Sequence, residues 1–157
     1  MQDFRRSILI VEDEESIRTS LAQIFTIMGH RVNCAPDGVA ALIEMGKEIP
    51  EILLSDLNMP GMSGFELLSV VRLRFPAVRV VAMSGAFSGS QIPSGVAADG
   101  FYAKGSGIAL LLTMIESLSI ANESVTRLSR LREYRETGTT HRGRSIGAQS
   151  TENQGAQ

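Results

Sequence analysis

The sequence has one cysteine, no long apolar run and no excess of basic residues, and each shortage argues against a class of protein. Cys34 cannot form a disulfide within the chain, which suits a reducing compartment. No apolar run approaches the length of about 18 residues that a membrane-spanning helix needs, and Ile8–Val11 is too short for a signal peptide. The net charge of -2 argues against a globally basic nucleic-acid binder. We therefore expect a cytoplasmic protein without direct contact to membrane or nucleic acid.

Charge and composition divide the 157 residues into two parts. Residues 1–121 hold 9 basic and 13 acidic side chains, whereas residues 122–157 hold 6 and 4, and those six are all arginine. From Thr137 onward small and polar residues dominate, and they bury too little apolar surface to order themselves. We expect one domain over 1–121, a helical extension over 122–136 and a disordered tail over 137–157.

Five short apolar runs alternate with segments of helical periodicity in the first part. The runs begin 21 to 26 residues apart, a spacing typical of βα units. They are Ser7–Val11, Arg31–Ala35, Ile52–Ser55, Val78–Met83 and Gly100–Ala103. Three of them are almost continuously apolar, as in strands that are buried on both faces. The pattern predicts an α/β fold, a doubly wound parallel sheet of five strands with helices on both faces.

Start and stop signals mark the helices between the runs. Gly29 ends the first helical segment, and Ser63 with Glu66 forms the capping box of a helix that ends before Pro76. The segment between the fourth and fifth runs, residues 88–100, differs because proline and several glycines interrupt it. Interior glycine costs about 1 kcal/mol and proline about 3 kcal/mol relative to alanine. We expect this fourth helix to be short, distorted or mobile.

Polar side chains follow four of the five runs at their carboxyl ends, where open parallel sheets bind ligands. They are Glu12 and Asp13, Asp56, Ser84 and Lys104. Three converging carboxylates repel one another unless a cation joins them, and oxygen ligands without histidine or cysteine suit Mg²⁺. An amine and a hydroxyl beside such a metal equip a carboxylate to accept a phosphoryl group.

Four segments together resemble the receiver domain of two-component response regulators over residues 7–121. They are Val11-Glu12-Asp13-Glu14, the loop from Ser55 to Gly64, Met83-Ser84-Gly85 and Phe101-Tyr102-Ala103-Lys104. The loop, Ser-Asp-Leu-Asn-Met-Pro-Gly-Met-Ser-Gly, is the most specific of the four. The resemblance implies a flavodoxin-like fold with strand order 2-1-3-4-5.

The resemblance also implies a role for each site residue. Asp56 accepts a phosphoryl group from a phosphohistidine on a sensor histidine kinase or a histidine phosphotransfer protein. The implied Mg²⁺ ligands are Glu12, Asp13, Asp56 and the main-chain carbonyl of Asn58. Lys104 and Ser84 contact the phosphoryl oxygens, and Ser84 moves together with the switch aromatic Phe101. The added charge then biases a two-state surface.

Three features depart from the family's pattern. Gly105 follows the lysine where proline is usual, which leaves the loop freer and Lys104 less fixed. Glu12 stands where aspartate is commoner, and its extra methylene still lets it reach a metal through water. The segment 88–100, with its glycines and proline, lies in the usual output face, so the switch there is expected to involve order and disorder.

Several functions are compatible with parts of this pattern. The first is a stand-alone phosphorylation switch, not an enzyme in the ordinary sense, which acts by protein contact or onward relay because only 36 residues follow the domain. A pseudo-receiver that binds partners without being phosphorylated remains an alternative. An aspartate-nucleophile phosphatase is disfavoured, because Asn58 stands where such an enzyme needs a second acid. A dinucleotide enzyme is disfavoured, because the glycines that it needs after the first strand are absent.

The arginine-rich stretch 122–136 has two interpretations. Val125, Leu128 and Leu131 can share one helix face. The stretch is then either a solvated continuation of the last helix or a helix that binds a partner or a second copy of the chain. Its deletion should alter self-association or partner binding in the second case only.

Overall fold

The computed structural model describes residues 5–86 and 92–138, and they form an α/β fold around one parallel sheet. The strands are β1 (Ser7–Val11), β2 (Arg31–Ala35), β3 (Ile52–Asp56), β4 (Arg79–Ser84) and β5 (Gly100–Ala103). The helices are α1 (Glu15–Ile27), α2 (Gly38–Lys47), α3 (Gly64–Arg74) and α4 (Ile108–Gly138). The strand order β2-β1-β3-β4-β5 confirms the predicted flavodoxin-like, doubly wound sheet.

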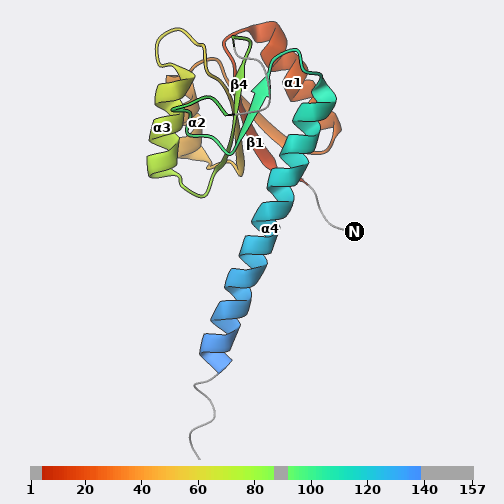
Figure 1. The fold of residues 1–157 in the computed structure, drawn as a ribbon, viewed down its shortest axis with the longest axis vertical. Coiled ribbons are helices and arrows are strands. Elements are labelled where there is room, and N and C mark those ends of the chain that lie inside the picture. The colour runs from red at the N-terminus through yellow and green to blue at the C-terminus, as the bar shows by residue number, and fades with distance from the viewer. Residues whose placement is uncertain (1–4, 87–91, 139–157) are drawn as a thin grey trace, which may run out of the picture. The chain divides into compact units, whose positions relative to one another are not determined.

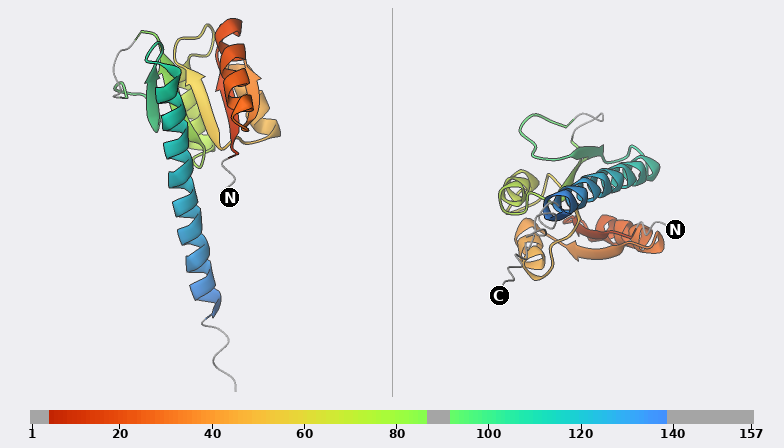
Figure 2. Two further views of the ribbon diagram at one scale, coloured as in Figure 1. Left: turned by 90° about the vertical axis from the view of Figure 1, so that its right-hand side faces the viewer. Right: turned by 90° about the horizontal axis from the view of Figure 1, so that it is seen from below.

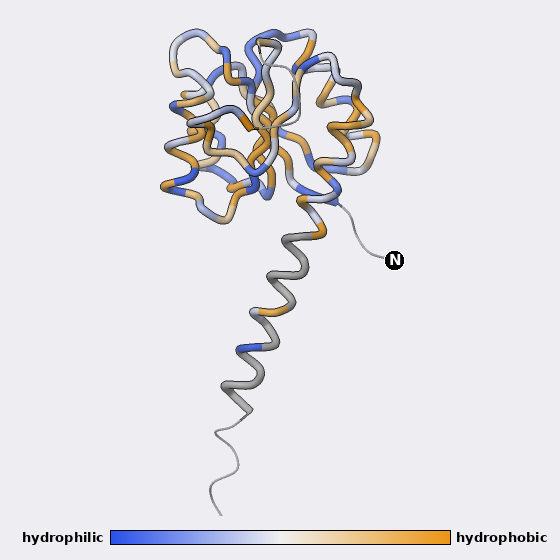
Figure 3. Tube along the Cα trace, in the orientation of Figure 1, coloured by the Kyte–Doolittle hydropathy of each residue, from blue (hydrophilic) through white to orange (hydrophobic). Residues whose placement is uncertain are grey.

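Alternate residues of the strands feed two apolar layers, one on each face of the sheet. In β1, Leu9 and Val11 pack with α2 and α3, while Ile8 and Ile10 pack with α1 and the first turns of α4. Figures 1 and 2 show these two pairs of helices on opposite faces of the sheet. All five residues of β3 are buried, and apolar residues follow the central strands in Figure 3. The near-continuous apolar composition of β1, β3 and β4 therefore reflects burial on both faces.

The helix ends have the geometry that the sequence predicts. Gly29 follows α1 with a φ of 91°, and its N–H donates to the carbonyl of Thr26 at 2.9 Å. Such a left-handed backbone is typical of glycine after a helix. At the start of α3, the Ser63 side chain accepts from the N–H of Glu66, whose carboxylate accepts from the N–H of Ser63. This reciprocal pair is the predicted capping box.

The connection between β4 and β5 differs from the expectation of a fourth helix. Residues 92–99, the described part, hold a turn in which the carbonyl of Pro93 accepts from the N–H of Val96, and they contain no helix. Gly95 has a φ of 82°, which a helix does not use. Val96 and Ala98 pack onto the layer shared with α2 and α3, so this loop covers sheet surface there. The expectations for residues 87–91 lie outside the described residues.

The chain divides into two compact units, Met1–Ala121 and Asn122–Gln157, and α4 contributes to both. The predicted helical extension, residues 122–136, lies within α4. The predicted disordered tail falls mostly on residues 139–157, outside the described residues. That residues 1–121 form an independent domain stays a prediction. Among the described residues no helix is long and apolar enough to span a membrane.

Gly64, the last residue of the specific loop, begins α3 directly against β3. A Cβ atom at this position would lie 2.1 Å from the carbonyl oxygen of Asp56 and 2.6 Å from the Cα of Leu57. The N–H of Gly64 donates to the carbonyl of Leu57 at 3.1 Å, which fixes this close approach. Only glycine lets the helix start here, and the helix start in turn holds the backbone at Asp56.

We predict that Gly64→Ala destabilises the protein by about 3 kcal/mol or more, because the added methyl collides with backbone that cannot move aside. The measurement is urea unfolding followed by circular dichroism. Gly46→Ala is the matched control. Gly46 lies in α2 with nothing within 4 Å of the added Cβ, so this change should stabilise by about 0.5–1 kcal/mol. Equal stability of Gly64→Ala and wild type would contradict the close approach.

Candidate functional site

The carboxyl ends of neighbouring strands bring the predicted site residues together. Asp56 and Ser84 are the last residues of β3 and β4, and Lys104 directly follows β5. Glu12 and Asp13 directly follow β1, which pairs with β3, and β3 pairs with β4, which pairs with β5. Parallel pairing therefore places all five side chains along one edge of the sheet.

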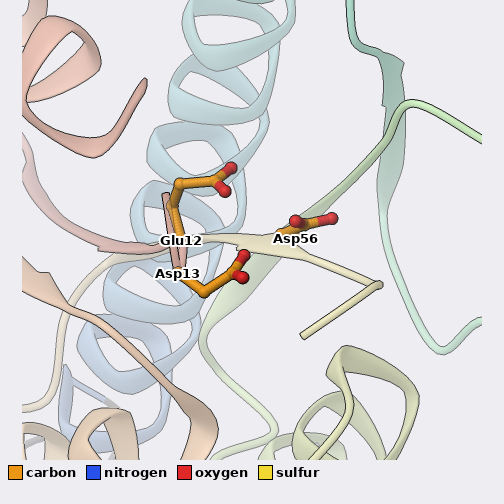
Figure 4. Close-up of side chains that lie close together, drawn as sticks. All are labelled: Glu12, Asp13 and Asp56. Carbon is orange, nitrogen blue, oxygen red and sulfur yellow. The ribbon is translucent and has the colours of Figure 1, made fainter. Parts of the chain in front are cut away.

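The three acids form one oxygen cluster. A carboxylate oxygen of each of Glu12, Asp13 and Asp56 lies within 4.8 Å of those of the other two (Figure 4). Glu12 and Asp56 are 1% and 4% exposed, whereas Asp13 is exposed to solvent. Two buried carboxylates beside an exposed one make an open, oxygen-lined position of the kind that hard cations occupy.

Lys104 bridges the two buried carboxylates. Its Nζ lies 2.7 Å from Oε2 of Glu12 and 2.9 Å from Oδ2 of Asp56. Burial alone would lower the pKa of Lys104, but the hydrogen bonds to these two acids outweigh it and hold the pKa above its usual value. Burial raises the pKa of Glu12 above its usual value, and the hydrogen bond with Lys104 opposes that rise. The lysine is therefore a charged counter-ion at the centre of the site.

A hydrogen-bond network joins Asp56 to the end of β4. The N–H of Asn58 donates to Oδ1 of Asp56 at 3.1 Å, and the side-chain amide of Asn58 donates to Oγ of Ser84 at 2.9 Å. The same Oγ accepts from the N–H of Ala86 at 3.0 Å. The main-chain N–H of Lys104 donates to the carbonyl of Ser84 at 2.8 Å. The Ser84 hydroxyl that the sequence predicts at the site is thus held by Asn58 and Ala86, and the Ser84 main chain by Lys104.

The chain turns at Gly105, directly after Lys104. Gly105 has a φ of 93°, a backbone conformation that a proline ring forbids. The N–H of Ser106 donates to the carbonyl of Ala103 at 3.1 Å. This turn and the two ion pairs of the lysine position Lys104, and the expectation that glycine leaves the lysine less fixed stays a prediction. Phe101 is 1% exposed and packs in the layer with α2 and α3.

Arg18 also contributes to the site, although the sequence analysis did not identify it. Its NH1 donates to the main-chain carbonyl of Glu12 at 2.7 Å and to that of Asp13 at 3.3 Å. It lies on α1, one helical turn after the acids. The sequence signal that could indicate this contact is a basic residue shortly after an acidic pair. That signal does not reveal that Arg18 binds the main chain and not the carboxylates.

The donor set suits a magnesium ion. The clustered ligand atoms are all carboxylate oxygens, and no histidine or cysteine is among them. Such a set favours Mg²⁺ or Mn²⁺ over zinc. The Lys104 amine and the Ser84 hydroxyl at the same edge of the sheet are groups that can bind and neutralise a phosphoryl group.

A comparison with protein families shows to which family the chain belongs. The family model of the response regulator receiver domain matches residues 8–116. The chain belongs to this family. The match includes both acids after β1 and the lysine after β5, so this oxygen cluster lies in the region where receiver domains bind Mg²⁺.

Relatives of this receiver domain resemble it over about half of its length. Sporulation initiation phosphotransferase F of Bacillus subtilis is 36% identical over 77 residues, which are 49% of this chain and 62% of that protein. Sensory transduction protein RegX3 of Mycobacterium tuberculosis is 41% identical over 78 residues, which are 48% of this chain and 34% of that protein. The matched part therefore spans less than two thirds of either relative.

Solved structures agree with the fold of this receiver domain. The chemotaxis protein CheY4 of Vibrio cholerae superposes with a TM-score of 0.64 at 25% identity, over 73% of this chain and 98% of that chain. A CheY-like receiver domain protein of Methanospirillum hungatei gives a TM-score of 0.69 at 25% identity, over 76% and 98% of the two chains.

We predict that Lys104→Met raises the affinity for Mg²⁺ by about tenfold, which corresponds to about 1.4 kcal/mol. The amine engages two of the three carboxylates, so its removal frees them for the cation. The measurement is calorimetric titration with MgCl₂. Lys47→Met is the control, because Lys47 pairs with Glu44 on α2 and should leave the affinity unchanged. Equal or weaker binding by Lys104→Met would show that the amine does not compete with the cation.

Proposed function

We propose that this receiver domain is a phosphorylation-dependent switch of a two-component phosphorelay, in which Asp56 is the phosphoacceptor. The arrangement around Asp56 carries the proposal. One carboxylate oxygen accepts from the N–H of Asn58 and the other faces the Lys104 amine. Two further acids and the Ser84 hydroxyl stand at the same edge of the sheet. Asp56 is thus oriented and partly neutralised in advance, which is the main contribution a protein makes to phosphoryl transfer.

The transfer itself is a simple exchange. An oxygen of the Asp56 carboxylate forms a bond to phosphorus, the bond from phosphorus to the donor's histidine nitrogen breaks, and the imidazole leaves. Mg²⁺, when bound, supplies positive charge to the phosphoryl oxygens; Glu12, Asp13, Asp56 and the main-chain carbonyl of Asn58 would hold it. Lys104 and Ser84 contact the remaining phosphoryl oxygens. In this proposal the chain assists only its own phosphorylation and dephosphorylation, and it is not an enzyme for other substrates.

The proposed switch begins at Ser84. Its Oγ is held by Asn58 and Ala86, so a hydroxyl that turns to a phosphoryl oxygen must exchange these partners. Phe101 lies on β5, next to β4, and its buried ring shares the layer with Val96 and Ala98 of the β4–β5 connection. A phosphoryl group adds a charge of about -1.5 to -2, enough to bias such a packing equilibrium. Movement of Ser84 would then reach the surface through Phe101.

The donor in this proposal is a sensor histidine kinase or a histidine phosphotransfer protein in the cytoplasm. The output is contact with a downstream protein or onward relay of the phosphoryl group. The similarity to sporulation initiation phosphotransferase F supports a relay function. The pseudo-receiver remains the second candidate, because the ion pairs of Lys104 with Glu12 and Asp56 offset part of the charge that a cation would neutralise.

We predict that acetyl phosphate adds one phosphoryl group to the wild type in the presence of Mg²⁺, and that Asp56→Asn abolishes this adduct. Intact-mass spectrometry, with and without EDTA, is the measurement. Asp37→Asn is a matched control, because Asp37 caps the N-terminus of α2 and asparagine is an equally good N-cap residue. This variant should be phosphorylated like the wild type. An adduct that persists in Asp56→Asn would refute the acceptor assignment. No adduct together with no magnesium binding would favour the pseudo-receiver, whereas magnesium binding without any adduct would indicate a receiver that requires its own phosphohistidine donor.

We further propose that the helical extension supports a homodimer. Leu128 lies on α4 and is 65% exposed, and the sequence predicts that it shares one helix face with Val125 and Leu131. Deletion of residues 122–157, or Leu128→Glu, should then shift sedimentation toward the monomer. Leu73→Glu is the control, because Leu73 is 83% exposed on α3. Unchanged sedimentation of both Leu128→Glu and the deletion variant would leave the extension a solvated helix.

A further inference from the structure

Arg18 reaches from α1 back to the segment that carries the acidic pair. NH1 of its guanidinium donates to the carbonyl of Glu12 at 2.7 Å and to the carbonyl of Asp13 at 3.3 Å. Both acceptors are main-chain atoms, so these two bonds engage neither carboxylate. A charged donor shared by consecutive carbonyls restrains the peptide planes of both residues, and hydrogen bonds to charged groups are the stronger ones.

The acidic pair needs such a restraint because it lies between two regular elements. Val11 ends β1, and α1 begins at Glu15. The N-cap of α1 is Glu14, whose side chain forms no capping hydrogen bond. Instead, the N–H of Glu14 donates to a carboxylate oxygen of Glu12 at 3.3 Å. The side chain that is proposed to approach the metal therefore also serves as a weak helix cap.

Because Asp13 is exposed, the direction of its carboxylate depends on the conformation of its own main chain. Glu12 is almost fully buried and Lys104 contacts it, whereas Asp13 is exposed and takes its direction from its own main chain. A rotation of the peptide between these two residues would turn the Asp13 carboxylate away from Asp56. Arg18 donates to the carbonyl of Glu12, which precedes the nitrogen of Asp13, and to the carbonyl of Asp13 itself. These two hydrogen bonds oppose that rotation.

We propose that Arg18 is a positioning residue of the magnesium site, an inference that rests on the proposed function. It holds the main chain of Glu12 and Asp13 so that their carboxylates converge with that of Asp56. Partners that orient metal ligands without touching the metal typically change metal affinity by about 10–100-fold when they are removed. Arg18 therefore contributes to magnesium affinity through backbone geometry.

The sign of the effect separates this proposal from a simple charge effect. Arg18 carries a positive charge near the site, and that charge by itself repels Mg²⁺. Removal of the charge alone would strengthen magnesium binding. Loss of the backbone restraint would weaken it. A variant that lacks both the charge and the donors shows which contribution is larger.

The experiment is calorimetric titration of the full chain with MgCl₂ for the wild type, Arg18→Met and Arg18→Lys. Arg18→Met keeps an apolar stem without donors, and Arg18→Lys keeps the charge with a single donor group. Gln23→Met, at an exposed position of the same helix, is the matched control. Urea unfolding of each variant in EDTA measures stability without metal, which separates loss of a metal site from loss of the fold.

We expect at least about tenfold weaker magnesium binding for Arg18→Met, an intermediate affinity for Arg18→Lys and no change for Gln23→Met. Unchanged or tighter binding by Arg18→Met would overturn the proposal. Weaker binding with an equal fractional loss of folded protein in EDTA would also overturn it, because the effect would then be structural. If the wild type itself binds no Mg²⁺, the metal site of the proposed function fails, and this outcome is distinct from the failure of Arg18 alone.

Discussion

The repulsion among three carboxylates at one edge of the sheet is the constraint on which the site depends. Glu12 and Asp56 are buried, so their negative charges interact more strongly than they would in water. Lys104 offsets this repulsion by contacting both acids, and it thereby ties the ends of β1, β3 and β5 together. The position of the lysine depends in turn on the turn at Gly105 and on the hydrogen bond from its main chain to Ser84. A cation that enters the site must therefore rearrange charges that already have a partner.

Much of this arrangement follows from the sequence because parallel strands end at a common edge. Once the apolar runs are placed, Asp56, Ser84 and Lys104 must lie near one another. The capping box of α3 is equally local, because Ser63 and Glu66 are three residues apart and satisfy each other. The need for glycine at position 64 also has a local cause, the close approach to the backbone of Asp56 and Leu57. The sequence shows only the glycine, and the structure shows the backbone that it approaches. The roles of these residues in phosphoryl transfer remain predictions.

Other features could not be read from the sequence, for identifiable physical reasons. Arg18 binds main-chain carbonyls, and every residue has a carbonyl, so its partners leave no trace in the residue types. The bridge from Lys104 to Glu12 depends on the side-chain conformations of both residues, which sequence spacing does not reveal. The β4–β5 connection was expected to be a poor helix, but in its described part, residues 92–99, Pro93 and Gly95 lie in a turn, and Val96 packs against the apolar layer. Weak helix propensity shows that a helix is disfavoured, and it does not show what replaces it.

Gly105 has a consequence for how this receiver compares with its relatives. At a φ of 93°, the backbone that follows Lys104 cannot accept the proline that is usual in the family, because the ring fixes φ near -65°. The two residue types therefore belong to two different paths of the chain after β5, and they are not substitutes on one path. Replacement of Gly105 alone by proline would therefore require a different backbone path after β5. In this chain the left-handed turn directly follows the lysine whose amine contacts Glu12 and Asp56, so the constraint on residue type at position 105 lies one residue from the site.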